Sequence, residues 1–216
     1  MAKFAEKKRI KMAFKYTNDL INQGFTYAAY RNKISNQLAE QDSAQESVRK
    51  LLKYTSKNEA RMTSLDQSLT LIPEVLETLR NSKPVTWLVL TEGWCGDAAS
   101  SVPVIAAIAA QFPDKIKLRF FFRDENPELM DVHLTNGGRS IPKLIMLDES
   151  SHFITSWGPR PQALQDQMDV WKAEYENDFT ALIRRVNAWY DEDKSVSIQS
   201  EICNMMADQA TGPQSV

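Results

Sequence analysis

The stretch that decides the fold is Leu88–Pro103, which reads LVLTEGWCGDAASSVP. It lies within an apolar run that starts at Val85 and predicts a buried strand. Gly93 marks a turn, and the alanine-rich residues 98–110 contain no glycine and predict a helix. Cys95 therefore lies between a strand and a helix. Because the free N–H groups and the dipole of a helix N-terminus favour an anion, we expect a lowered pKa for this thiol.

The composition is that of an ordinary globular protein. The chain has 216 residues, a formal net charge of −2 and two cysteines, Cys95 and Cys203. This length suits one large domain, or one domain with an extension. The charge gives no case for a nucleic acid or a membrane as partner, and no apolar run approaches the roughly 20 residues that span a bilayer. Two cysteines make no disulfide scaffold, which favours a reducing, cytoplasmic setting.

Lysines and an arginine crowd the first fifteen positions, but no apolar stretch follows to make a signal peptide. We favour a basic, solvated helix face there; a targeting peptide or a basic membrane anchor stays open. Helical patterns fill residues 1–82, at 7–22, 26–39, 48–69 and 73–82. We interpret residues 1–82 as an N-terminal helical extension that packs on the rest of the chain. A dimerisation or docking surface is the alternative, which leaves a homodimer open.

The second half alternates between strand and helix patterns. The expected strands are 85–90, 116–122, 144–147 and 153–157. The expected helices are 98–110, 127–134 and one long helix over 161–189, whose aromatic residues should pack on the sheet. Residues 191–216 are expected to form a C-terminal tail, partly disordered, with a short helix at 196–206.

Several short motifs resemble the thioredoxin superfamily. The strand that leads into Trp94-Cys95-Gly96 and then into a helix is that family's active-site layout. Pro103 falls where the family's proline kinks this helix. Further along, residues 123–127 resemble a strand-to-helix junction, Ser140-Ile141-Pro142 resembles the cis-proline segment, and Gly158 resembles the glycine after the last strand. The motifs occur in the family's order.

The resemblance implies an α/β, thioredoxin-like domain over residues 83–190, with a mixed sheet of about four strands flanked by helices. The whole chain is similar to a bacterial subgroup whose members carry W-C-G-D-A and extra N-terminal helices. The expected organisation is therefore an N-terminal helical extension over 1–82, the thioredoxin-like domain, and the tail over 191–216.

The chain departs from the family where a second cysteine is expected. Two-cysteine thioredoxins resolve the mixed disulfide with a thiol three residues after the first, and Ala98 holds that position here. Val89 replaces the family's buried acid, and Phe120 replaces the lysine that faces it. The resemblance therefore implies monothiol chemistry, in which Cys95 attacks a disulfide and an external thiol releases the product.

Asp97 replaces the proline of the family's active-site turn, which here comprises Trp94, Gly96, Asp97 and Ala98 around the cysteine. One interpretation is an acid in the first helical turn, stabilised by the helix dipole. The other is a carboxylate that raises the pKa of Cys95 by like-charge repulsion. The sequence leaves both open.

The resemblance also implies a substrate-facing surface. In the family the cis-proline faces the active-site cysteine, and the backbone before it pairs with a substrate peptide, which assigns these roles to Pro142 and Ile141. Arg139 is a candidate for binding a carboxylate, such as that of glutathione. Glu92 and Trp94 are expected at the rim of the site. A turn that only positions the strand and a solvated arginine are the simpler interpretations.

No metal or cofactor is expected. His133 and His152 show no ligand spacing with each other or with Cys95, and no phosphate loop, catalytic triad or nucleic-acid motif is present. Glutathione or another small thiol enters only as a co-substrate. We favour an incidental role for Cys203 over that of a distant resolving thiol, because geometry decides disulfides.

Three functions remain in competition. We favour a cytoplasmic thiol–disulfide oxidoreductase that forms mixed disulfides through Cys95 with a protein or a low-molecular-weight disulfide. The second is a non-catalytic thioredoxin-fold module that binds a protein partner through the cis-proline face. The third makes the N-terminal helices the functional surface. The missing resolving cysteine and acid–lysine pair motivate the second function.

Overall fold

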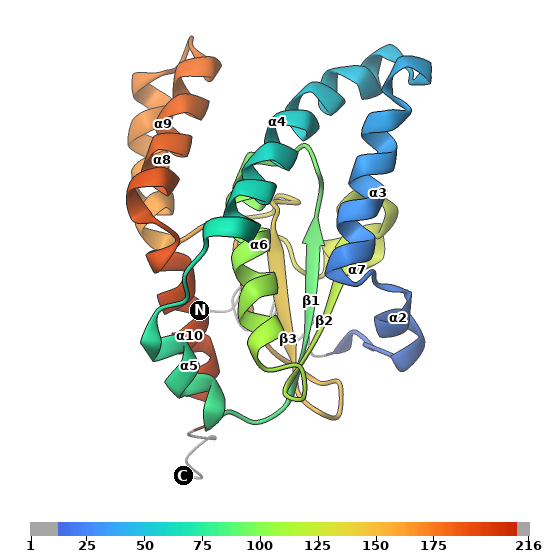
Figure 1. The fold of residues 1–216 in the computed structure, drawn as a ribbon, viewed down its shortest axis with the longest axis vertical. Coiled ribbons are helices and arrows are strands. Elements are labelled where there is room, and N and C mark those ends of the chain that lie inside the picture. The colour runs from blue at the N-terminus through green and yellow to red at the C-terminus, as the bar shows by residue number, and fades with distance from the viewer. Residues whose placement is uncertain (1–12, 211–216) are drawn as a thin grey trace.

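The computed structural model describes residues 13–210 (Figure 1). Before the first strand it contains α2 (Asn18–Gln23), α3 (Tyr27–Ala39), the 3-10 helix η1 (Gln41–Ser43), α4 (Glu46–Ser68) and α5 (Pro73–Arg80). The middle of the chain contains β1 (Val85–Thr91), α6 (Gly96–Gln111), β2 (Ile116–Phe122), η2 (Arg123–Glu125) and α7 (Pro127–Asp131). The last part contains β3 (Lys143–Leu147), β4 (Phe153–Trp157), α8 (Gln162–Glu174), α9 (Phe179–Asp193) and α10 (Val196–Ala210).

The four strands form one mixed sheet in the order β2-β1-β3-β4. β1 is parallel to β2 and antiparallel to β3, and β4 is antiparallel to β3. The parallel pair is joined through α6, because parallel neighbours need a crossover connection. The expected α/β fold, with a four-stranded mixed sheet and helices before it, is confirmed.

β1 is the centre of the core, since nearly all of its side chains are buried on both faces. α6 packs between the sheet and α4, so both sides of this helix are covered. Its small side chains allow that close approach, and residues 98–106 are all buried. The same packing fixes the N-terminal end of α6, where Cys95 lies.

The N-terminal extension shares this core. Tyr30 of α3 stacks on Phe120 of β2 with ring centroids 5.2 Å apart, and Phe120 pairs in register with Val89 of β1. All three side chains are fully buried. These strand positions are the ones where the family was expected to carry an acid and a lysine. Here they form part of the apolar surface on which α3 packs.

Polar contacts also join α4 to the segment around Cys95. The Asn58 side-chain amide donates a hydrogen bond to the Gly93 carbonyl at 2.9 Å. The Arg61 Nε donates to the Ser100 hydroxyl at 2.7 Å. The extension therefore touches the turn before Cys95 and the helix after it.

The C-terminal helices differ from the single helix expected over 161–189. α8 ends at Glu174, and Asp178 caps α9 by accepting a hydrogen bond from the Ala181 N–H at 2.8 Å. The α8–α9 pair extends beyond the carboxyl end of β1, as the α3–α4 pair does on the other side (Figure 1). Phe179, the first residue of α9, is therefore 67% exposed, whereas Leu182, Val186 and Trp189 stay partly buried against the core.

The short helix expected over 196–206 is present and is longer, as α10 (Val196–Ala210). α10 packs against α5 and α6. Ile198, Ile202 and Met206 are buried in the common core, because they follow one another on one face of the helix. Residues 211–216 lie outside the described part of the chain.

The helix expected over 7–22 is interrupted within the described residues, because residues 14–17 are not helical. α2 begins at Asn18, and Thr17 caps it by accepting a hydrogen bond from the Leu20 N–H at 3.2 Å. An N-cap threonine with this bond starts a helix, which explains the boundary. Residues 1–12, where the basic helix face was expected, lie outside the described residues.

Gly158 fixes how the segment after β4 meets the proline segment. Its φ of +105° is a conformation that favours glycine, and a Cβ atom there would lie 2.2 Å from the Pro142 carbonyl oxygen. The Ile141–Pro142 and Gly158–Pro159 peptide bonds are both cis. Close contact between these two segments therefore requires glycine at position 158.

Gly158→Ala is expected to lower the free energy of unfolding by at least about 2 kcal/mol, because the new methyl group meets backbone in a strained conformation. Urea unfolding measures the loss. Gly96→Ala is the matched control: a Cβ atom there meets nothing within 4 Å, and the stability should change by no more than about 1 kcal/mol. Equal stability of Gly158→Ala and the wild type would contradict the steric account.

Candidate active site

Cys95 occupies the N-cap position of α6. Its side chain is 9% exposed, and the thiol donates a hydrogen bond to the Ile141 carbonyl oxygen, with Sγ and O 3.3 Å apart. Ile141 precedes Pro142, so the structure brings the cysteine and the cis-proline segment into direct contact.

The surroundings of Cys95 favour the protonated thiol. The pKa of Cys95 is raised to about 12, chiefly by burial and in second place by the Asp97 carboxylate. The N–H groups of Ala98 and Asp97 and the Arg160 guanidinium lower this pKa, but they do not outweigh the lost hydration. The bond to Ile141 acts in the same direction as burial, because only the thiol can donate it. The expected lowering of the pKa by the helix N-terminus is therefore wrong.

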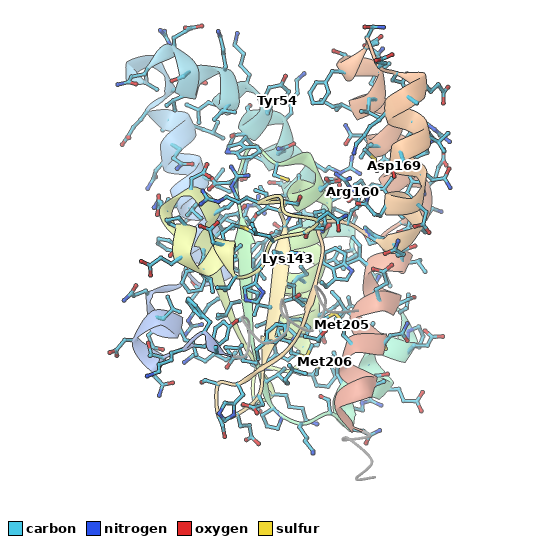
Figure 2. The ribbon with its side chains drawn as sticks, turned by 180° about the vertical axis from the view of Figure 1, so that it is seen from behind. Tyr54, Lys143, Arg160, Asp169, Met205 and Met206 are labelled. Atoms are coloured by element: carbon cyan, nitrogen blue, oxygen red, sulfur yellow. The ribbon has the colours of Figure 1, made fainter. Side chains whose placement is uncertain are left out.

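Asp97 connects the active-site turn to the C-terminal helices. Its carboxylate forms an ion pair with Arg160 and accepts a hydrogen bond from the Tyr190 hydroxyl at 2.9 Å. The side chain of Asp97 is only 11% exposed. Figure 2 shows Arg160 at the base of the α8–α9 pair. Both interpretations of Asp97 are supported: it lies in the first turn of α6, and it raises the pKa of Cys95, an effect that Arg160 partly offsets.

A groove of about 510 Å³ opens beside Cys95. One wall is the segment before Pro142, and the other comes from α8 and α9. Four of the predicted site residues line the groove: Trp94, Cys95, Arg139 and Ile141. Gly96, Asp97, Ala98 and Pro142 are not part of its lining: the first three form the first turn of α6, and Pro142 is buried beside Ile141.

Glu92 lies on the other side of the turn from this groove. Its side chain is 8% exposed and lines a second pocket of about 330 Å³ between α4 and the active-site turn. One carboxylate oxygen accepts a hydrogen bond from the Asp124 N–H at 2.9 Å. Burial raises the pKa of Glu92 to about 7. The structure thus separates Glu92 from the other residues expected to face a substrate.

Cys203 is not placed to resolve a disulfide at Cys95. Both cysteines are free, and Cys203 donates hydrogen bonds to the Thr78 hydroxyl at 3.0 Å and to the Glu74 carbonyl at 3.3 Å. Both partners lie in α5, which precedes β1, whereas Cys95 follows β1. A seven-residue strand of roughly 20 Å separates the two ends.

The sequence analysis missed the residues that α8 and α9 bring to the groove. Arg160, Lys172, Phe179 and Leu182 form much of the second wall. With a single helix over 161–189, Phe179 and Leu182 were expected on the face that packs on the sheet. The signal that was available is Asp178, a good N-cap residue directly before Phe179.

Comparison with known proteins assigns the chain to a family. The family model for thioredoxin matches residues 44–172. Thioredoxin 1 of Synechococcus elongatus is 33% identical to this chain over 86 residues, which are 40% of this chain and 77% of that protein. The chain therefore belongs to the thioredoxin family.

Two solved structures share the fold. A crystal structure of an HIV epitope scaffold has a TM-score of 0.58 at 16% identity, and a Pseudomonas aeruginosa protein of unknown function has a TM-score of 0.56 at 17% identity. Each match covers 90% of this chain and 99% of the other, so it extends over helices outside the thioredoxin core. At these identities the likeness shows the fold alone.

Within residues 13–210, no helix combines the length and the apolar character needed to cross a bilayer.

Asp97→Asn and Arg160→Gln are expected to change the reactivity of Cys95 in opposite directions. Removing the carboxylate lowers the thiol pKa, and removing the guanidinium raises it. Each pKa unit changes the thiolate fraction at neutral pH about tenfold, and the alkylation rate follows that fraction. The measurement is the rate of iodoacetamide alkylation against pH, in a Cys203→Ala background.

If the substitutions instead loosened the α8–α9 pair, Cys95 would become more exposed and alkylation would be faster in both variants. The electrostatic account predicts slower alkylation of Arg160→Gln. A faster rate in that variant than in the parent chain therefore contradicts it.

Glu92 is expected to make stability depend on pH. Its pKa is raised on folding, so its contribution is fully present below about pH 4.5 and is lost as the pH rises through about 7. Glu92→Gln removes this loss. Between pH 4.5 and pH 8, the free energy of unfolding of the variant should rise relative to the wild type by roughly 3 kcal/mol. If urea titrations give the same difference in free energy of unfolding between the variant and the wild type at both pH values, the pKa of Glu92 is not raised.

Proposed function

We propose that this chain is a monothiol thiol–disulfide oxidoreductase that forms mixed disulfides through Cys95. The observation that carries the proposal is the hydrogen bond between the Cys95 thiol and the Ile141 carbonyl, in a chain of the thioredoxin family. The bond places the sulfur beside the backbone that pairs with substrates in that family. Protein disulfides and low-molecular-weight disulfides are the proposed substrates.

The proposed reaction is a disulfide exchange. The Cys95 thiolate attacks one sulfur of the substrate, the S–S bond breaks, and the other sulfur leaves as a thiolate that takes a proton from water. Ala98 offers no thiol and Cys203 is remote, so a thiol from solution attacks the mixed disulfide next. That step restores the Cys95 thiolate and leaves the released substrate sulfur bonded to the external thiol.

Deprotonation is the demanding step, because Cys95 is buried and protonated in the free chain. A substrate N–H that donates to the Ile141 carbonyl competes with the thiol for the same acceptor. That competition removes one contact that favours the protonated form, while Arg160 remains to stabilise the thiolate. Substrate binding and deprotonation are therefore coupled in this proposal.

A non-catalytic binding module is the second candidate, and the buried, protonated state of Cys95 favours it. α4 adds a surface for such a role. Val48, Leu51 and Tyr54 are 44%, 43% and 47% exposed and follow one another at steps of three residues. Exposed apolar groups at this spacing suit a docking surface for a protein or for a second copy of the chain.

A reducing bacterial cytoplasm is part of the proposal. Both cysteines are free and buried, which supports that setting, because disulfides form and persist mainly in oxidising compartments. No resident cofactor is proposed, and a small thiol such as glutathione serves as co-substrate.

Cys95→Ser is expected to abolish the formation of mixed disulfides, because a hydroxyl does not exchange with sulfur. The full chain is incubated with oxidised glutathione and with oxidised bacterial extract, and adducts are detected by intact mass and on non-reducing gels. Cys203→Ser is the matched control and should keep the adducts. The redox proposal fails if the wild type forms no adduct and if, under reducing conditions, Cys95→Ser binds the same proteins from the extract as the wild type does.

A further inference from the structure

The size and the charged lining of the groove beside Cys95 indicate which class of thiol completes the reaction. This inference rests on the proposed function, in which a second thiol must come from solution. Cys95 is 9% exposed and lies on the wall of the groove. An incoming thiol therefore approaches the mixed disulfide through this groove. Its volume of about 510 Å³ is within the range of small-molecule sites.

The first wall presents two guanidinium groups. Arg123 follows β2, lies over the Trp94 ring at 4.9 Å from its centroid, and donates to the Arg139 carbonyl at 3.2 Å. Arg139 lies just before the cis-proline segment. The amide of Asn136 and the hydroxyl of Ser140 line the groove near them. This wall therefore offers mainly hydrogen-bond donors.

The second wall adds two more cations. Arg160 enters from the segment before α8, and Lys172 from α8 itself. The Nε–H of Arg160 is buried and has no hydrogen-bond partner. Lys172 is 57% exposed and lies 4.0 Å from Asp169, which is itself 92% exposed, so that pair contributes little.

No carboxylate lines the groove among the described residues. The carboxylates that pair with the arginines are outside its lining: Asp124 with Arg123, Asp131 with Arg139, and Asp97 with Arg160. These pairs hold the three guanidinium groups in fixed positions. The lining thus presents four cationic side chains from four segments of the chain, which is complementary to an anion.

We propose that this groove binds a small anionic thiol, one that carries at least one carboxylate, and presents it to the Cys95 mixed disulfide. The carboxylate binds among Arg123, Arg139 and Lys172. The thiol group points toward Cys95, past the apolar side chains of Ile141 and Met168 that line the same groove.

The step balances as a second disulfide exchange. The anionic thiol reacts as its thiolate and attacks the substrate-side sulfur of the mixed disulfide. The bond from that sulfur to Cys95 breaks, and Cys95 leaves as a thiolate. Cys95 then takes the proton that the attacking thiol lost to solvent.

The test compares thiols that differ in charge alone. The Cys203→Ala chain is loaded at Cys95 with the neutral reagent bis(2-hydroxyethyl) disulfide, and the return of the free Cys95 thiol is followed by intact mass. 3-Mercaptopropionate, 3-mercaptopropanol and 3-aminopropanethiol supply a negative, a neutral and a positive group. Each rate is divided by the rate of the same thiolate with bis(2-hydroxyethyl) disulfide itself, so that intrinsic reactivity cancels.

The normalised rates are expected to fall in the order anionic, neutral, cationic, with about a fivefold gap between the first two at low salt and less at high salt. Lys172→Gln and Arg139→Gln are each expected to lower the ratio of anionic to neutral rates. Both side chains are more than half exposed, so the fold tolerates the change. Lys50→Gln on α4, with a side chain 71% exposed, is the matched control and should leave the ratio unchanged.

The outcomes separate the two proposals. If the reagent does not load Cys95, the proposed function fails and this inference fails with it. If loading occurs but the three normalised rates are equal, or the cationic thiol is fastest, the inference alone is overturned. An anionic preference that Lys172→Gln and Arg139→Gln leave intact also overturns it, because the groove is then not its source.

Discussion

The hydrogen bond from the Cys95 thiol to the Ile141 carbonyl is the constraint on which the site depends. It joins the N-terminus of α6 to the cis-proline segment, and Gly158 must lack a side chain for that segment to keep its place. It also requires a proton on the sulfur. In the proposed exchange, the contact that holds Cys95 beside the cis-proline segment therefore also keeps the sulfur protonated until something replaces this contact.

The N-terminal extension and the missing redox residues have one structural explanation. Val89 and Phe120 are paired across β1 and β2, and Tyr30 stacks on Phe120. A buried acid and a lysine at these positions would lie under an apolar helix surface, where desolvation costs several kcal/mol per ion. Replacement of the charged pair is thus what allows α3 to pack here. The charged side chains that act on the pKa of Cys95 then lie on the other side: Asp97 raises this pKa and Arg160 lowers it.

Local sequence patterns were sufficient for the fold but not for the electrostatics of the site. The strand before Gly93 and the small-residue helix after it placed Cys95 correctly, because periodicity and turn residues act locally. The sign of the Cys95 pKa shift was wrong, since a helix N-terminus is visible in sequence whereas burial under distant segments is not. Arg160 and Lys172 were missed for the same reason. The break at Asp178 adds Phe179 and Leu182 of α9 to the same wall, where a single long helix had been expected.

Direct titration of Cys95 tests this account most closely. With ¹³C-labelled cysteine and Cys203→Ala to leave one signal, the Cβ chemical shift is followed from pH 5 to the alkaline limit of the folded chain. The account predicts a thiol that stays protonated throughout the neutral range, in line with a pKa raised to about 12. A transition to thiolate near pH 7 would contradict it, because the helix N-terminus would then outweigh burial and the bond to Ile141.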